Sequence, residues 1–379
     1  ADPGDLDEAP EQIEERLYLR ERPDRLGDAA RDYQNERLAA LLAEREQWVV
    51  QRREQAISLL EDFIRSEPET AAEMPDALMR LAELQWEKAR ADYLVAFGAW
   101  QEVPEANRGP TPSPDYRRSM ELYDRILANH PDFERIDLVL YMNAYAHVEK
   151  GETDAALALY QKILDEHPQS RFVPDAHFAL AESQFAVAEW PGALAEFEKV
   201  MEHRESELFD ISLFKSAWAL WRMGRTDEAA VRFRRVLDLG RGRGAMSAAQ
   251  RRRLRELQDE ALDYLIQVFV EDENNTAADV FAFLEEIGGE RYANRVLIRL
   301  SDTFMGQSRF ERAIEAYELL LEMDPMARKA PQYQREIASA QAQLGEPSAT
   351  IAAMSTLAST YAPGSAWAVQ QGGSDRVER

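Results

Sequence analysis

The sequence has 379 residues, of which 30% are charged and 45% hydrophobic, and its formal net charge at pH 7 is −25. So acidic a chain repels phosphate, which argues against general nucleic-acid binding. It has no cysteine, which excludes disulfides, thiol catalysis and thiolate metal sites. No apolar run reaches the length of a transmembrane segment. The length allows two or three globular domains or one repeat array.

The first residues, Ala1-Asp2-Pro3-Gly4-Asp5, contain no initiator methionine and no pattern of a signal peptide. We expect either the mature end of an exported protein or a trimmed boundary. Residues 1–27 are expected to be flexible or partly helical.

Two long helices are predicted in residues 28–131. Residues 28–67 contain neither glycine nor proline, and apolar residues recur there at helical spacing between Arg and Glu pairs. We interpret them as one helix, although two helices meeting near Gln47–Gln51 would also fit. A second helix is predicted after Pro75, since proline suits the first helical turn. Four prolines and one glycine in residues 103–114 then predict an inserted loop.

Residues 132–240 contain three units with one shared pattern. An alanine recurs about every 36 residues, an aromatic residue follows four positions later, and a branched residue comes three positions after that. Residues with this spacing share one helix face, and the small alanine lets a second helix approach closely. The positions are Ala156, Ala193 and Ala229, then Tyr160, Phe197 and Phe233, then Ile163, Val200 and Val236.

This pattern resembles the tetratricopeptide repeat (TPR) family, whose units are helix–turn–helix hairpins of about 34 residues. The resemblance implies an all-α fold, a right-handed superhelical solenoid of antiparallel helix hairpins, with about eight hairpins in this chain. Each hairpin would cover its apolar face only with its neighbours.

The pattern loosens after residue 240. Residues 241–290 are predicted to form a glycine-rich hinge at Gly240–Gly244 and a degenerate hairpin, with helices around 247–270 and 276–287. Residues 291–362 return to the repeat pattern. Residues 363–379 are predicted to be a disordered tail.

No catalytic, cofactor or metal site is predicted, and the chain is expected not to be an enzyme. The five histidines have neither zincin nor facial-triad spacing. The Gly-x-Gly of residues 240–244 follows no predicted strand, which a phosphate-binding loop requires. No acid–base pair stands out among the many carboxylates.

In the TPR family the first helix of each unit lines a concave groove. Carried onto this sequence, the resemblance predicts a groove for a partner protein or peptide, because aromatic side chains offer large contact area and lose few rotatable bonds. The alternative is that these aromatics fill the core between repeats. The candidates are Tyr141, Tyr145, Phe178, Glu182, Phe185, Phe214, Trp218 and Trp221.

Some TPR domains grip a C-terminal carboxylate with Lys, Arg and Asn side chains. Here the central groove positions are aromatic or acidic, and Lys215 is the only lysine nearby. Arg295 and Arg299 are the remaining candidates, in a later repeat. We therefore do not expect a carboxylate clamp.

Arginines crowd the middle of this acidic chain. Their guanidinium groups bind carboxylate and phosphate, so they predict a docking patch for an acidic partner or anionic lipid headgroups. The alternative is a solvated face paired with neighbouring Glu and Asp. The candidate patch consists of Arg241, Arg243, Arg251, Arg252, Arg253 and Arg255.

The junction His167–Ala176, followed by Ala179-Leu180-Ala181-Glu182-Ser183, is similar to repeats of bacterial envelope TPR proteins. These include lipoproteins of outer-membrane assembly and the periplasmic coordinator associated with Tol–Pal. The resemblance implies a non-enzymatic scaffold in the periplasm or envelope, after signal removal, that recruits proteins to a secretion, assembly or motility machine. The alternative is a cytoplasmic TPR adaptor or regulator that binds a peptide of a partner protein.

Overall fold

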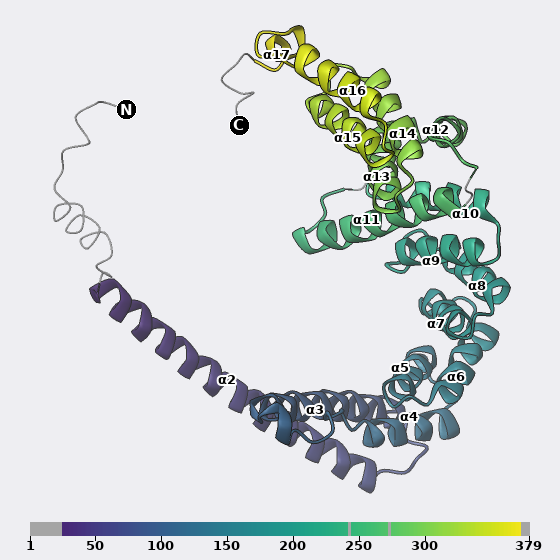
Figure 1. Cartoon of the computed structure of the whole chain (residues 1–379). Coiled ribbons are helices and arrows are strands. Elements are labelled where there is room, and N and C mark those ends of the chain that lie inside the picture. The colour runs from purple at the N-terminus through teal and green to yellow at the C-terminus, as the bar shows by residue number, and fades with distance from the viewer. Residues whose placement is uncertain (1–24, 242–243, 272–273, 373–379) are drawn as a thin grey trace. The chain divides into compact units, whose positions relative to one another are not determined.

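The computed structural model describes residues 25–241, 244–271 and 274–372. These residues contain sixteen α-helices, two short 3₁₀ helices and no strand. The helices follow one another as consecutive antiparallel pairs (Figure 1), which confirms the predicted all-α fold of helix hairpins. The chain divides into two compact units between Lys150 and Gly151.

Unit 1, residues 1–150, is built around two long helices. Helix α2 runs unbroken for 42 residues, which confirms the single long N-terminal helix. Its second half packs on α3 and α4, where Ile57 shares a core with Leu78 and Tyr123. The described helices are α2 (Arg25–Ser66), α3 (Met74–Glu102), α4 (Arg117–Asn129) and α5 (Ile136–Glu149).

The predicted inserted loop, residues 103–114, lies between α3 and α4 and folds back on the end of α3. It contains a 3₁₀ turn, Glu105–Asn107. The Trp100 indole Nε1 donates to the Gly109 carbonyl at 2.9 Å. The Arg108 guanidinium donates to the carbonyl of Val103 at 2.9 Å and lies 4.9 Å from the Trp100 ring centroid. These contacts tie the loop to its helix.

Unit 2, residues 151–379, holds the regular repeats. All nine positions of the alanine–aromatic–branched pattern are buried, with at most 5% of any residue exposed, so the predicted repeat core is confirmed. The helices are α6 (Thr153–Glu166), α7 (Val173–Ala186), α8 (Trp190–Glu202), α9 (Phe209–Arg222), α10 (Thr226–Leu237), α11 (Ala248–Glu271), α12 (Ala277–Glu286), α13 (Ala293–Gly306), α14 (Phe310–Met323), α15 (Ala330–Gln343), α16 (Pro347–Thr360) and α17 (Ala366–Gln370).

The turns inside the regular pairs of unit 2 each place one residue in the left-handed backbone region. Gly224 and Gly345 have φ of 74° and 75°, while Ala188 and Ser308 have φ of 60° and 58° in the matching turns. The following amide then donates to the carbonyl five residues earlier, at 2.9 to 3.1 Å. This geometry satisfies the last carbonyls of the first helix and starts the second.

Residues 241–290, predicted to hold a hinge and a degenerate hairpin, contain α11 and α12. Helix α11 has 24 residues, and its fully buried side chains begin only at Ala261. Helix α12 has 10 residues and packs against α13 and α14. Gln258 of α11 anchors the pair to the repeat before it, since its Nε2 donates to the carbonyls of Leu237 and Leu239, both at 3.0 Å. Residues 242–243 of the predicted hinge lie outside the described residues.

The predicted disordered tail is wrong for part of its length, because residues 366–370 form α17. Trp367 is buried, and its indole Nε1 donates to the Ala327 carbonyl at 2.8 Å. Gln371 adds a second bond, from its Nε2 to the Met326 carbonyl at 2.9 Å. The end of the described chain thus docks on the loop between α14 and α15. Residues 1–24 and 373–379, also predicted to be flexible or disordered, lie outside the described residues.

Candidate functional site

The predicted groove residues fall in both units. In unit 1, Tyr141 and Tyr145 lie on α5, and Tyr145 is 39% exposed. Its ring lies 5.6 Å from that of Trp86, which stacks on Tyr116 at 3.7 Å. Burial, together with the nearby Glu149 carboxylate, raises the pKa of the Tyr145 phenol. Tyr145 therefore offers part of its ring to solvent and remains neutral at physiological pH.

Phe214, a predicted groove residue, belongs to the core of unit 2. It is 8% exposed, and its ring lies 5.8 Å from each of Phe233 and Tyr264. The alternative interpretation of the aromatic pattern is right at this position, because α11 brings Tyr264 over the ring.

The other predicted aromatics of unit 2 are half-buried at the edge of the core. Phe178 meets the buried Phe197 edge-on at 5.9 Å. Phe185 of α7 lies 4.9 Å from Trp218 of α9, and Trp218 lies 6.4 Å from Trp221. These rings form a continuous surface across the first helices of two repeats.

The sequence pattern missed Trp190, which completes this surface. Trp190 is the first residue of α8, the second helix of its pair, where the family resemblance places no groove position. Its ring lies 5.2 Å from both Phe185 and Trp218. The sequence did contain a signal for Trp190. It is a tryptophan directly before Pro191, at a helix start where the repeat pattern places no core residue. We call Phe185, Trp190, Trp218 and Trp221 the aromatic wall.

Charged groups border the aromatic wall. Lys215 of α9 donates to Glu182 of α7, with 2.6 Å between Nζ and Oε2, and its ammonium lies 5.0 Å from the Phe185 ring centroid. The predicted groove residue Glu182 is therefore neutralised by its partner. The Arg222 guanidinium lies over Trp190 and Trp218, at 5.9 and 5.4 Å. The rings of the aromatic wall can therefore pack against apolar and aromatic groups, and the guanidinium beside them can bind a carboxylate.

The arginines considered for a carboxylate clamp are ion-paired with α11. Arg299 Nε lies 2.7 Å from Asp263 Oδ1, and Arg295 pairs with Asp259. Lys215 is likewise paired with Glu182. A carboxylate ligand at these three cations would have to displace an existing partner.

The described arginines of the predicted docking patch are exposed, at the start of α11 and just before it. Arg241 lies 3.7 Å from Asp238, and Arg252 lies 3.8 Å from Glu256 while 72% exposed. Such long, exposed pairs contribute little energy and leave the guanidinium groups accessible. Residues 239–255 contain no Asp or Glu. Arg243 lies outside the described residues.

Neither a metal site nor a membrane span emerges from the described part of the chain. It has no group of three or more His, Cys, Asp or Glu placed to hold a metal ion. None of its helices is both long and apolar enough to cross a bilayer.

Comparison with known proteins identifies the repeats. Residues 141–203 and 298–365 match one family model described as tetratricopeptide repeat, and residues 212–239 match a second with the same description. The matched family is generally non-catalytic, and no catalytic domain is among the matches. No curated protein matches the sequence.

Two of the matching solved structures are of bacterial repeat proteins. One is the C-terminal part of a TPR repeat-containing protein from Cytophaga hutchinsonii, with 13% identity, 74% of this chain and 94% of that chain covered, and a TM-score of 0.39. Another is a tetratricopeptide repeat protein from Parabacteroides merdae, with 11% identity, 73% and 93% covered, and a TM-score of 0.32. Three segments between residues 141 and 365 therefore match models of the tetratricopeptide repeat, and these segments form such repeats.

Proposed function

We propose that this protein is a non-enzymatic scaffold whose aromatic wall binds segments of partner proteins. The observation that carries the proposal is the run of half-buried rings from Phe185 to Trp221. Because these rings are held on packed helices, they offer a large contact area and lose little side-chain conformational entropy when a partner binds. Residues of this kind typically dominate the binding free energy. The Arg222 guanidinium beside them supplies a partner for an acidic residue of the bound segment.

We further propose that the scaffold serves a bacterial envelope machine for secretion, outer-membrane assembly or motility, in the periplasm. The support is the resemblance of the junction His167–Ala176 to repeats of envelope TPR proteins. A cytoplasmic adaptor that binds a partner's peptide is the alternative. The coding sequence upstream of Ala1 discriminates between them: a signal peptide or lipobox supports the envelope, and an ordinary cytosolic start supports the adaptor.

The wall is tested by affinity capture from a lysate of the native organism with the wild-type protein and a Trp218→Ala/Trp221→Ala variant. The proposal predicts that a partner captured by the wild type is lost from the double variant, because truncating central aromatic residues removes most of the binding energy. Far-UV circular dichroism checks that the variant keeps its helical content.

The matched control is Trp48→Ala, which removes an indole that is 58% exposed on α2, in unit 1. This variant should capture the same partner as the wild type. If the double variant retains every partner, the wall is not the binding surface. Loss of the partner from Trp48→Ala alone would move the site to the long N-terminal helix.

A further inference from the structure

A cavity of about 530 Å³ lies where the degenerate hairpin departs from regular pairing. Helix α12 is much shorter than α11 and packs on α13 and α14. A ring pair bridges α11 and α12, since Phe269 meets Phe283 edge-on at 5.7 Å. Beside this bridge, the start of α10, the end of α11 and the start of α12 enclose open space. It is lined by Thr226, Asp227, Ala230, Val268, Phe269, Glu271, Asn275, Asp279, Val280 and Phe283.

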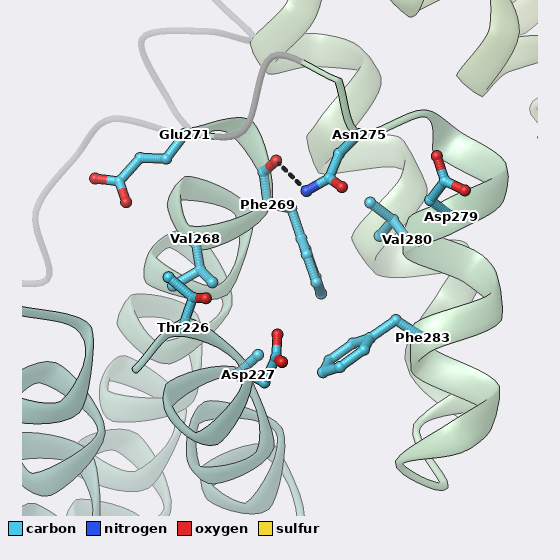
Figure 2. Close-up of a pocket in the computed structure, with 10 residues that line it drawn as sticks. Thr226, Asp227, Val268, Phe269, Glu271, Asn275, Asp279, Val280 and Phe283 are labelled. Carbon is cyan, nitrogen blue, oxygen red and sulfur yellow. Dashed lines mark hydrogen bonds between the residues drawn. The ribbon is translucent and has the colours of Figure 1, made fainter. Parts of the chain in front are cut away.

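The floor of the cavity is apolar. Val268 and Phe269 come from α11, Val280 from α12 and Ala230 from α10, and all four are buried. Figure 2 shows the Phe269 ring between the two helices, with Phe283 pointing toward it. Cavities of this size with apolar walls and a few polar groups are typical ligand sites.

Carboxylates stand at the mouth of the cavity, where Asp227, Glu271 and Asp279 are exposed. Asp279 is committed to the N-terminal cap of α12: the Thr276 hydroxyl and amide donate to its Oδ2 at 2.6 and 2.9 Å, which lowers its pKa. Glu271 accepts a 2.6 Å bond from the Trp221 indole, a neutral donor. The Asp227 carboxylate has no hydrogen bond or ion pair within the described part of the chain, and the residue is drawn below the Phe269 ring in Figure 2.

Of the carboxylates at this mouth, Asp279 lies in the field of a cation, because Arg312 helps to lower its pKa. None of the lining residues is Lys or Arg. Arg309, which precedes α14, donates to the Val270 carbonyl at 3.2 Å. On α14, Arg312 pairs with Glu315 at 3.0 Å and makes a weaker 3.5 Å contact to the Asn274 carbonyl. Asp227 and Glu271 therefore present uncompensated negative charge above an apolar floor.

We propose that this cavity binds an extended segment of a partner protein in which a lysine or arginine adjoins a large apolar residue. The apolar side chain packs against Phe269 and Phe283, and the cation lies between the carboxylates of Asp227 and Glu271. Such a pairing buries apolar area and satisfies the charge at the mouth at the same time. The site adjoins the aromatic wall, because Glu271 accepts a hydrogen bond from Trp221, but none of the four wall residues lines the cavity.

The test uses the full chain with methyl-labelled valine and follows the Val268 and Val280 signals by NMR. The probes are the blocked dipeptides acetyl-Arg-Leu-amide and acetyl-Glu-Leu-amide. At millimolar concentrations, a range suited to fragments of this size, the Arg-Leu probe should shift both valines and the Glu-Leu probe should not. Asp227→Arg should weaken Arg-Leu binding about tenfold or more, because it places like charges together.

Two further variants keep the result decisive. Asp227→Asn removes the charge without adding bulk and should also weaken binding, whereas Glu285→Arg, on α12 but outside the lining, should leave it unchanged. Equal shifts with both probes, no shift with Arg-Leu, or unaltered binding by Asp227→Asn would overturn the proposal. Valine signals that move with protein concentration alone would place a second copy in the cavity and would overturn it too.

Discussion

The left-handed turn residues show how a single side chain can strain a repeat. Gly224 and Gly345 adopt this backbone freely, because glycine has no Cβ to meet the following carbonyl. Ala188 and Ser308 adopt it too, at a conformational cost of about 1 kcal/mol each. A Cβ placed at Gly224 would meet no atom within 4 Å, so the cost of a side chain there is purely conformational.

This difference predicts opposite effects for two substitutions. Ala188→Gly should raise the free energy of unfolding of unit 2 by about 0.5 kcal/mol, the relief of strain less the extra entropy of glycine in the unfolded chain. Gly224→Ala should lower it by about 1 kcal/mol. Urea unfolding followed by circular dichroism measures both, and a destabilised Ala188→Gly variant would show that the turn is not strained.

Single residues also show what the sequence could predict about the site. The buried alanine, aromatic and branched positions were predictable because each repeat makes the same contacts. Phe214 and Trp218 follow the same spacing, yet only Phe214 is covered, because Tyr264 comes from the irregular helix α11. A contact from outside the repeat pattern leaves no periodic trace. Trp190 was overlooked for a similar reason, because it lies outside the repeat positions that the pattern assigns to the groove.

Among the elements, helix α2 packs against its unit with only one of its faces. On α2, Ile57 is buried at 6% exposure while Leu59, two residues later, is 71% exposed. The absence of glycine and proline made the length of α2 predictable. Which turns are covered depends on α3 and α4, and spacing alone could not show it.

These two residues of α2 form a matched pair of tests. Ile57→Ala should destabilise unit 1 by about 3 kcal/mol, since it removes buried methyl groups from a closed core. Leu59→Ala should change the free energy of unfolding by less than about 0.5 kcal/mol. The measurement is denaturant unfolding of each variant. Similar losses for both would mean that α2 is covered on the face assigned to solvent.

Helix α17 is too short to be predicted from its sequence. Its five residues span little more than one turn, so no helical spacing of apolar residues can be recognised in them. What fixes this helix is a bond from Trp367 to a carbonyl 40 residues earlier. A long-range contact of this kind has no local signature, so the segment was predicted to be disordered.

At the scale of the whole molecule, charge is distributed unevenly. The chain carries a net charge of −25, yet residues 239–255 contain arginines and no acid. Two arginines of the preceding helix are different, because Arg232 pairs with Glu198 and Arg234 with Asp238. The sequence predicted the cluster, but only the pairing pattern separates its exposed members from the neutralised ones.

The exposed cluster predicts retention on an anionic matrix despite the overall charge. Wild-type protein should bind immobilised heparin at low ionic strength and elute as salt screens the contact. Arg251→Glu/Arg252→Glu/Arg253→Glu should not bind. The control Arg232→Gln/Arg234→Gln should elute with the wild type, since those charges are already paired. Retention of the triple variant would place the anion contact elsewhere.

The first half of α11 has a consequence for how this protein could change over time. Because residues 248–253 at its start are all exposed, about two helical turns contribute little to the stability of the stack that carries them. Substitutions there would alter surface charge while the free energy of unfolding stays nearly constant. Selection could therefore retune the affinity for an anionic partner in this segment without the loss of foldedness that accompanies most interface changes.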